Sequence, residues 1–122
     1  MAEKEIYKKM KEYVNDRGGR FTRIENAVSA GVPDVNICIN GVEVWIECKE
    51  ALGKKVEIRA SQFVWAIEQR AAGGEWYCMI KHGGGYAVGM NNDILKLKKS
   101  VDVAEFPNFK SVAEALQFIF MG

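Results

Sequence analysis

The chain has 122 residues, 48% of them hydrophobic and 27% charged, and its net charge is +1. This length and composition are typical of one globular domain spanning residues 1–122, and no apolar run approaches the roughly 18 residues that a membrane-spanning helix needs. The near-neutral charge argues neither for nor against binding to nucleic acid, because an acidic metal site offsets basic surface in the total.

The N-terminal segment, residues 3–16, is predicted to form a helix. Its apolar residues recur on one face: Ile6, Met10, Tyr13 and Val14. Two glycines follow the segment and end the helix. Because the segment is charged and lacks the apolar region of a signal peptide, we expect a cytoplasmic protein.

Residues 20–26 alternate in polarity and contain β-favouring side chains, so they are predicted to form the first strand. Phe21, Arg23 and Glu25 then share one face of that strand. If that face meets the acidic face of the next two strands, Glu25 is a third acid for the site or for a second metal ion. Alternatively, Arg23 holds Glu25 in a structural ion pair.

Residues 31–49 are predicted to form a β-hairpin. Two alternating strands, 34–39 and 42–49, are joined by Asn40-Gly41, a pair that favours a type I′ turn because both central residues need positive φ. One face of the hairpin is apolar: Val35, Ile37, Ile39, Val42, Val44, Ile46 and Cys48. The other face is polar: Asp34, Asn36, Cys38, Glu43, Trp45, Glu47 and Lys49.

In this register the carboxylates of Asp34 and Glu47 lie directly opposite each other. Such residues have Cβ atoms ~4.5–5.5 Å apart, and like charges placed so are destabilising. A divalent cation between the two carboxylates removes the repulsion, and one or two carboxylates with water and phosphate suit Mg²⁺. Lys49 projects from the same face beside the pair. The alternative interpretation is a solvated sheet face with mixed charges.

A polar connection, residues 50–59, leads to a second predicted helix over 60–72. Lys54, Lys55 and Arg59 in the connection are candidate DNA contacts, with a plain surface loop as the alternative. Gln62 lies in the first turn of the helix, and its amide both donates and accepts hydrogen bonds. It is a candidate for orienting water or a phosphate oxygen, unless it is only solvated. Trp65 is interpreted as a packing residue rather than a base-stacking platform.

The C-terminal part of the chain is expected to contribute structure rather than chemistry. The predicted elements are strands at 75–81 and 86–90, a short helix at 91–99 and a last helix from a capping box at 111–114 to about 121. His82, the sole histidine, lies on a loop tip and is given no catalytic role. The three cysteines lack metal-binding spacing and are expected to be reduced.

Three parts of this pattern together resemble the signature of the PD-(D/E)xK nucleases. They are Pro33-Asp34, Glu47-Cys48-Lys49 and, thirteen residues later, Gln62. With Gly31 before the first part and Arg23-Ile24-Glu25-Asn26 upstream, the chain is most similar to the small VRR-NUC proteins of bacteriophages. The resemblance covers roughly residues 20–90.

The resemblance implies an α/β fold with a restriction-endonuclease-like core: a helix, a three-stranded antiparallel meander, a helix, further strands and a C-terminal helix. It implies that Asp34, Glu47 and the backbone carbonyl of Cys48 hold Mg²⁺ or Mn²⁺, and that Lys49 and Gln62 take part in catalysis. The family often takes an extra acid from its first helix, for which Glu3 is the best placed. A solvated glutamate stabilised by the helix dipole is the alternative for Glu3.

The function expected from the resemblance is metal-dependent hydrolysis of phosphodiester bonds in DNA by an endonuclease. Relatives of this size tend to act as dimers on branched DNA, so a homodimeric resolvase of four-way (Holliday) junctions is the sharpest hypothesis. If the protein is phage-encoded, it acts in the cytoplasm of a bacterial host. Nicking and flap cleavage stay open, and a non-catalytic DNA-binding or assembly module on the same fold is the competing class.

Overall fold

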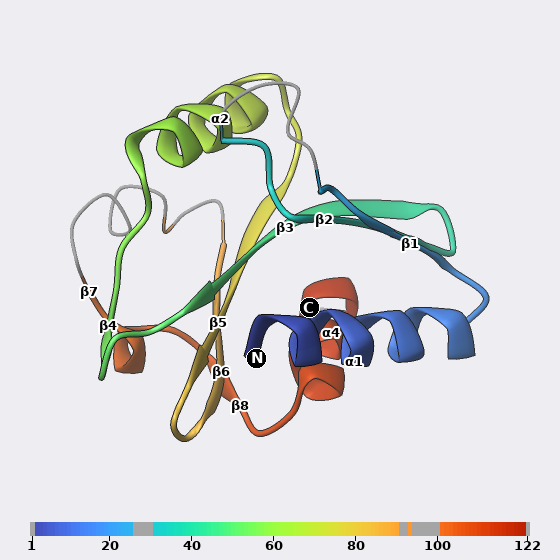
Figure 1. The fold of residues 1–122 in the computed structure, drawn as a ribbon. Helices are drawn as coiled ribbons and strands as arrows, with labels where there is room; N and C mark the ends of the chain where they lie inside the picture. Colours follow the sequence, from blue (N-terminus) through green and yellow to red (C-terminus); the bar gives the residue numbers. More distant parts are fainter. Residues whose placement is uncertain (1, 26–30, 91–92, 94–100, 122) are drawn as a thin grey trace.

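A six-stranded mixed sheet lies at the centre of the structure, a computed structural model that describes residues 2–25, 31–90, 93 and 101–121 (Figure 1). The elements in chain order are α1 (Ala2–Asp16), β1 (Arg20–Arg23), β2 (Val35–Ile39), β3 (Val42–Glu50), β4 (Lys55–Val56), α2 (Ala60–Ala71), β5 (Trp76–His82), β6 (Gly85–Gly89), β7 (Val101–Asp102), the 3-10 helix η2 (Val103–Glu105), β8 (Asn108–Phe109) and α4 (Val112–Met121). The strands of the sheet are ordered β1-β2-β3-β5-β6-β8, and β4 pairs with β7 separately. The helix, meander, helix, strands and final helix therefore follow in the predicted order.

The predicted hairpin is present with its predicted register. β2 and β3 are antiparallel, and Val35 pairs with Ile46. Both turn residues have positive φ, 51° at Asn40 and 82° at Gly41, as a type I′ turn requires. β1 completes the meander by pairing with β2, but it ends at Arg23, earlier than predicted.

β3 occupies the interior of the sheet. It is antiparallel to β2 on one side and parallel to β5 on the other. Parallel neighbours need a crossover connection, and α2 supplies it between β3 and β5. β2 pairs with the first half of β3 and β5 with the second half, so every residue of β3 has a paired neighbour strand and its side chains are held on a rigid element.

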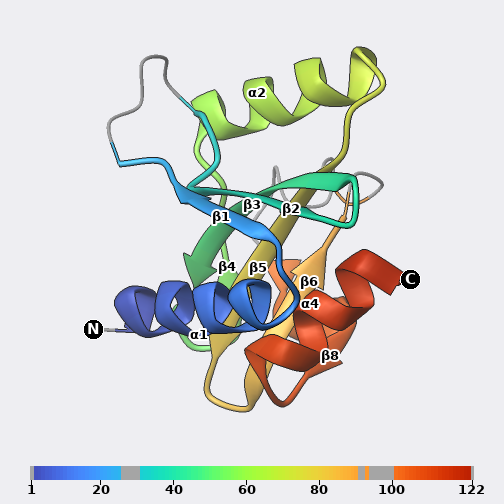
Figure 2. The ribbon, with the colours of Figure 1, turned by 90° about the vertical axis from the view of Figure 1, so that its right-hand side faces the viewer.

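Helices cover both faces of the sheet: α1 and α4 lie on one face and α2 lies on the other (Figures 1 and 2). The apolar side of the hairpin packs with α1 and α4, where Met10, Ile37 and Leu116 are fully buried. A second core, which includes Ala66 and Trp76, lies between α2 and the β5–β6 part of the sheet. The polar side of the hairpin consequently faces the α2 layer.

The apolar last helix packs on this chain's own core. Its buried residues are Val112, Ala115, Leu116 and Ile119. The predicted capping box is formed in part, since Oγ of Ser111 accepts a hydrogen bond from the Glu114 N–H at 3.1 Å. The Glu114 carboxylate reaches back one residue further than predicted and accepts the Lys110 N–H at 3.1 Å.

One predicted helix lies outside the described residues, and three short strands were not predicted. The predicted helix at 91–99 lies outside the described residues, apart from Asp93. The strands β4, β7 and β8 were not predicted, because each has two residues and offers no periodicity to detect. Within the described segments, no helix combines the length and the apolarity that crossing a membrane requires.

Candidate active site

Asp34 stands directly before β2, at the end of the turn that starts at Gly31. Its Oδ2 accepts a hydrogen bond from the backbone N–H of Cys48 at 2.9 Å. This bond draws the carboxylate toward β3, beside the residue that follows Glu47. The predicted juxtaposition of Asp34 and Glu47 is thus present, held by a bond between a side chain and the main chain.

Glu47 is almost completely buried, with 3% of its surface exposed. Its Oε2 accepts a hydrogen bond from Nε2 of Gln62 at 2.9 Å. Its Oε1 is buried and has no hydrogen-bond partner among the described residues. A buried oxygen of this kind is costly, and it marks a position where a proton or a cation belongs.

The surroundings of Glu47 raise its pKa to about 8 from an ordinary value of 4.5. Burial is the largest cause, and the neighbouring charge of Asp34 is the next. The cations Lys49 and Arg59 act in the opposite direction and lower the pKa. One acid and two cations therefore lie close enough to the Glu47 carboxyl group to shift its pKa.

Gln62 connects this carboxyl group to the start of α2. Its Oε1 accepts the backbone N–H of Arg59, the N-cap residue, at 2.9 Å, while its Nε2 donates to Glu47. The sequence suggested a contact with water or phosphate; the structure instead shows both ends of the amide used within the protein. Gln62 orients Glu47, and the same bonds stabilise the first turn of α2.

One turn beyond Gln62, Trp65 packs on Trp45 of β3. Their ring centroids are 5.5 Å apart and the planes are inclined by 57°. This edge-on arrangement is a favourable aromatic contact and joins α2 to the sheet next to the acids. Trp65 is a packing residue, as predicted.

Three cations gather in a pocket of about 470 Å³ beside the acids. Lys49, Lys55 and Arg59 line it, together with Glu50 and Glu57. Two of the three predicted DNA contacts therefore lie next to Lys49. The third, Lys54, is exposed on the neighbouring turn and is not part of the pocket lining.

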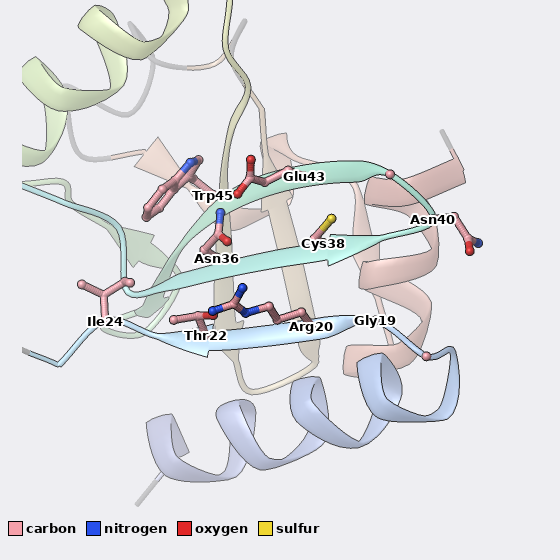
Figure 3. Close-up of a pocket in the computed structure, with 11 residues that line it drawn as sticks. Gly19, Arg20, Thr22, Ile24, Asn36, Cys38, Asn40, Glu43 and Trp45 are labelled. Atoms are coloured by element: carbon pink, nitrogen blue, oxygen red, sulfur yellow. The ribbon is translucent and has the colours of Figure 1, made fainter.

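A second hollow, of about 650 Å³, lies along the polar side of β1, β2 and β3 (Figure 3). Arg20, Thr22, Asn36, Glu43 and Trp45 point into it from the three strands (Figure 3). The strand alternation places it on the same side of the hairpin as the two carboxylates. The sequence showed no motif here, because the lining residues come together only when β1 pairs with β2.

The pairing of β1 decides whether Glu25 faces the two acids. Thr22 of β1 pairs with Asn36, so Thr22 shares the carboxylate side of the sheet, while Arg23 projects to the opposite side and lies over the ring of Tyr7 at 3.7 Å. A role for Glu25 required the side of β1 that carries Arg23 to face the two acids, and this side faces away from them. Glu25 itself is exposed just beyond β1. Neither does Arg23 hold Glu25 in an ion pair.

Glu3 lies in α1, whose packing face meets the opposite side of the sheet. Its side chain is outside the described part of the structure. His82 was expected on a loop tip but is the last residue of β5: its ring accepts the Gly84 N–H at 3.1 Å through Nδ1 and bonds to the Asn108 side chain through Nε2. The cysteines are free thiols, and Cys48 and Cys78 are buried.

The donor set fits a hard divalent cation. Carboxylate oxygens from Asp34 and Glu47 are the ligands that Mg²⁺ and Mn²⁺ prefer, and Oε1 of Glu47 has no partner within the described segments. The Cys48 N–H points to Asp34, and in a strand the carbonyl of the same residue faces the same edge. Among the described residues no group of three or more His, Cys, Asp and Glu side chains could hold a metal. Two carboxylates and one carbonyl would leave a bound Mg²⁺ with positions for water or phosphate.

No protein-family model matches the sequence, and no curated protein matches it either. Solved structures do match the fold. A Holliday junction resolvase from the archaeal hyperthermophile Archaeoglobus fulgidus superposes with a TM-score of 0.65 at 17% sequence identity, over 92% of this chain and 98% of that one. A VRR_NUC domain superposes with a TM-score of 0.52 at 17% identity, over 76% of this chain and 89% of that one. The fold expected from the sequence is confirmed, because the chain has the restriction-endonuclease-like architecture of these two proteins.

Proposed function

We propose that this protein is a metal-dependent endonuclease that hydrolyses phosphodiester bonds in branched DNA. The observation that supports this most directly is the carboxylate pair. Asp34 is tied to the backbone of Cys48, Glu47 is tied to Gln62, and the buried Oε1 of Glu47 lacks a partner among the described residues. Burying Glu47 beside a second, partly exposed acid destabilises the fold, and a divalent cation bound between the two carboxylates would offset that cost.

Asp34 and Glu47 hold the cation, helped by the backbone carbonyl of Cys48. When bound, the cation polarises the scissile phosphate and makes hydroxide available near neutral pH. Lys49, on the same side of β3, positions the attacking water or offsets the charge that grows on the phosphoryl oxygens. Gln62 keeps the Glu47 carboxylate in one orientation, which matters because catalytic groups lose effect steeply when misplaced.

The DNA backbone is proposed to contact the pocket described above and the neighbouring turn that carries Lys54. Lys55 and Arg59 line the pocket beside Lys49, and Lys54 is exposed next to it. Phosphate contacts of this kind hold the substrate in register without reading its sequence. That suits an enzyme that recognises the shape of branched DNA.

Four-way DNA is the proposed substrate, and a homodimer is the proposed active form. The Archaeoglobus fulgidus protein with the similar fold is a Holliday junction resolvase, which supports the choice of a junction. A four-way junction has two-fold symmetry, and two symmetric cuts require two active sites. One chain offers one carboxylate pair within its described segments.

A cleavage assay tests the proposal. The purified protein is incubated with end-labelled four-way, flap and linear duplex DNA in Mg²⁺, in Mn²⁺ and in EDTA. We expect cleavage of the branched substrates with either metal and none in EDTA. Asp34→Asn and Glu47→Gln should each abolish cleavage, whereas Glu43→Gln, an exposed glutamate on the same side of β3, should not.

Thermal melting in EDTA accompanies the assay to separate lost chemistry from lost folding. Above pH 8, where Glu47 carries its charge, each of the two substitutions removes one charge from a repelling pair, so the melting temperature measured there should hold or rise. Full activity in either variant would exclude this pair as the site. Tight junction binding without cleavage in any metal would instead identify a non-catalytic DNA-binding module.

A further inference from the structure

Gly31 makes the closest approach between the Asp34 turn and α2. A Cβ atom built on Gly31 would lie 2.1 Å from the carbonyl oxygen of Ser61, 2.5 Å from its carbonyl carbon and 2.9 Å from the backbone nitrogen of Gln62. All three are main-chain atoms in the first turn of a helix, so none can move aside as a flexible side chain would. Only glycine allows the turn to rest on the helix at this distance.

This contact closes a ring of interactions around the two acids. From Gly31 the chain runs three residues to Asp34, whose carboxylate accepts the Cys48 N–H. The neighbour of Cys48 in β3 is Glu47, which accepts from Gln62. Gln62 belongs to the turn of α2 against which Gly31 rests. Every other step in the ring is a covalent link or a hydrogen bond.

We propose that Gly31 is a positioning residue: its missing side chain sets the distance between the Asp34 turn and the helix that carries Gln62, and so the placement of Asp34 relative to Glu47. Any Cβ at position 31 pushes the turn away from α2. The Asp34 carboxylate then moves with it, because only three residues separate the two positions. The inference rests on the proposed nuclease function for its catalytic consequence, but not for its structural one.

Two glycine variants separate close approach from backbone strain. Gly31 has φ +85°, and Gly73, which follows the C-terminal end of α2, has φ +87°. An added Cβ at Gly73 would meet nothing within 4 Å. Gly31→Ala and Gly73→Ala therefore carry the same strain of a left-handed alanine, and only the first adds a clash. Insertion of one glycine between Gly31 and Val32 is a third variant, which loosens the turn without adding a side chain.

The structural readout is the backbone amide of Cys48, followed by NMR for its proton shift and its hydrogen exchange. In Gly31→Ala we expect the Cys48 signal to move toward its position in Asp34→Ala, which lacks the acceptor, and its exchange to accelerate. In Gly73→Ala it should stay at the wild-type position. An unchanged Cys48 amide in a folded Gly31→Ala protein would overturn the proposal, whatever the protein does to DNA.

The functional readouts are the affinity of the free protein for Mn²⁺, measured by electron paramagnetic resonance, and the single-turnover cleavage rate of a four-way junction. Gly31→Ala and the insertion should weaken Mn²⁺ binding and lower the rate roughly 100-fold, the effect of about 1 Å of misplacement, with junction affinity unchanged. Rates equal to that of Gly73→Ala would overturn the proposal.

The outcomes also distinguish this inference from the proposed function. A wild-type protein that neither binds Mn²⁺ nor cleaves, but whose Cys48 amide responds to Gly31→Ala, would refute the nuclease and support the positioning role. If Gly31→Ala does not fold, the insertion variant carries the test: its full activity with an unmoved Cys48 amide would overturn the proposal, and loss of both would support it.

Discussion

The two oxygens of Glu47 have different surroundings. Oε2 accepts a hydrogen bond from Gln62, while Oε1 is buried with no partner within the described segments. A carboxylate in this state is poorly solvated, and it carries the repulsion of Asp34 as well. At the scale of single residues, the central feature of the site is thus a poorly solvated carboxyl group. Its charge depends on whether a proton or a cation lies beside it.

The raised pKa of Glu47 predicts how stability depends on pH in metal-free protein. The folded state keeps this proton up to about pH 8, whereas the unfolded chain releases it near 4.5. Between these values the folded state binds more protons, so the free energy of unfolding should fall as pH rises, and below pH 4.5 the group contributes no change. Urea unfolding in EDTA at pH 5 and pH 8 measures the effect.

Glu47→Gln is the control for this pH dependence, since the amide does not titrate. The variant should lose less stability than wild type between the two pH values. Added Mg²⁺ should restore more stability at pH 8 than at pH 5, because binding displaces the proton. Identical pH profiles for wild type and Glu47→Gln would show that the environment of Glu47 is not the one described.

The Lys49→Ala variant should lose cleavage activity but still bind the metal ion and DNA. The Lys49 side chain shares the pocket with Lys55 and Arg59, so those cations still attract phosphate when it is removed. We expect a single-turnover rate lower by roughly 100-fold or more, the contribution of a positioned acid–base or electrostatic group. Lys11→Ala, which changes an exposed lysine of α1 on the opposite face of the sheet, is the matched control. Loss of Mn²⁺ binding in Lys49→Ala would assign it a structural role instead.

Gln62→Ala should impair catalysis more than DNA affinity. Removing the amide frees Glu47 to rotate and deprives the Arg59 N–H of its acceptor. Gln69 lies two turns further along α2, ~10 Å away at 1.5 Å rise per residue, and its side chain donates to the Glu75 carbonyl, at 3.4 Å. Single-turnover rates should fall for Gln62→Ala and stay near wild type for Gln69→Ala. Equal effects would contradict the orienting role.

At the scale of elements, β3 and the start of α2 make the site. β3 is hydrogen-bonded on both edges and carries Glu47 and Lys49, and α2 starts beside it because the connection after β3 returns the chain to the same face. The Trp45–Trp65 contact fastens the two elements next to the acids. The site is therefore built between a central strand and a helix N-terminus, and Asp34 joins it from the turn before β2 through its bond to the Cys48 N–H.

α4 lies on the other face, and a change at its start should affect stability alone. Ser111→Ala removes the oxygen that accepts the Glu114 N–H. Loss of such a cap lowers the free energy of unfolding by about 1 kcal/mol. Denaturant unfolding should show this loss, and the junction-cleavage rate should equal that of wild type. A large change in the cleavage rate would mean that α4 is coupled to the site.

At the scale of the whole molecule, the fold is a twisted sheet with helices on both faces and a hollow along the polar side of β1–β3 (Figures 2 and 3). The apolar residues of α4 pack on the chain's own core. The case for a dimer consequently rests on the symmetry of the proposed substrate.

We expect sedimentation velocity at micromolar concentration to show a species of twice the chain mass, alone or with a four-way junction. The reason is that paired cuts in a two-fold junction need two sites held in fixed relation. A linear duplex of the same length is the comparison substrate. A monomer under all these conditions would contradict the homodimer and favour a nicking or flap-cleaving enzyme.

Much of the fold could be predicted from the sequence, because the signals that determine it are local. Alternation and the Asn40-Gly41 turn determine the hairpin, and the turn alone sets which residues face each other. The opposition of Asp34 and Glu47 follows from that register. Short-range geometry of this kind depends on neighbours in the chain, so no knowledge of distant packing was needed.

The tertiary structure decided everything that depends on contacts between distant segments. The pairing of β1 with β2 determines which side of β1 meets the acids. The side that carries Arg23 faces away from them, so the arrangement on which a role for Glu25 depended is not formed. Gln62 was found by its position in the sequence, but its bond to Glu47 exists only because the α2 crossover places the helix start over β3. The pKa of Glu47 depends likewise on burial, which a sequence does not contain. Burial and long-range pairing are properties of the packed chain, and local preferences do not determine them.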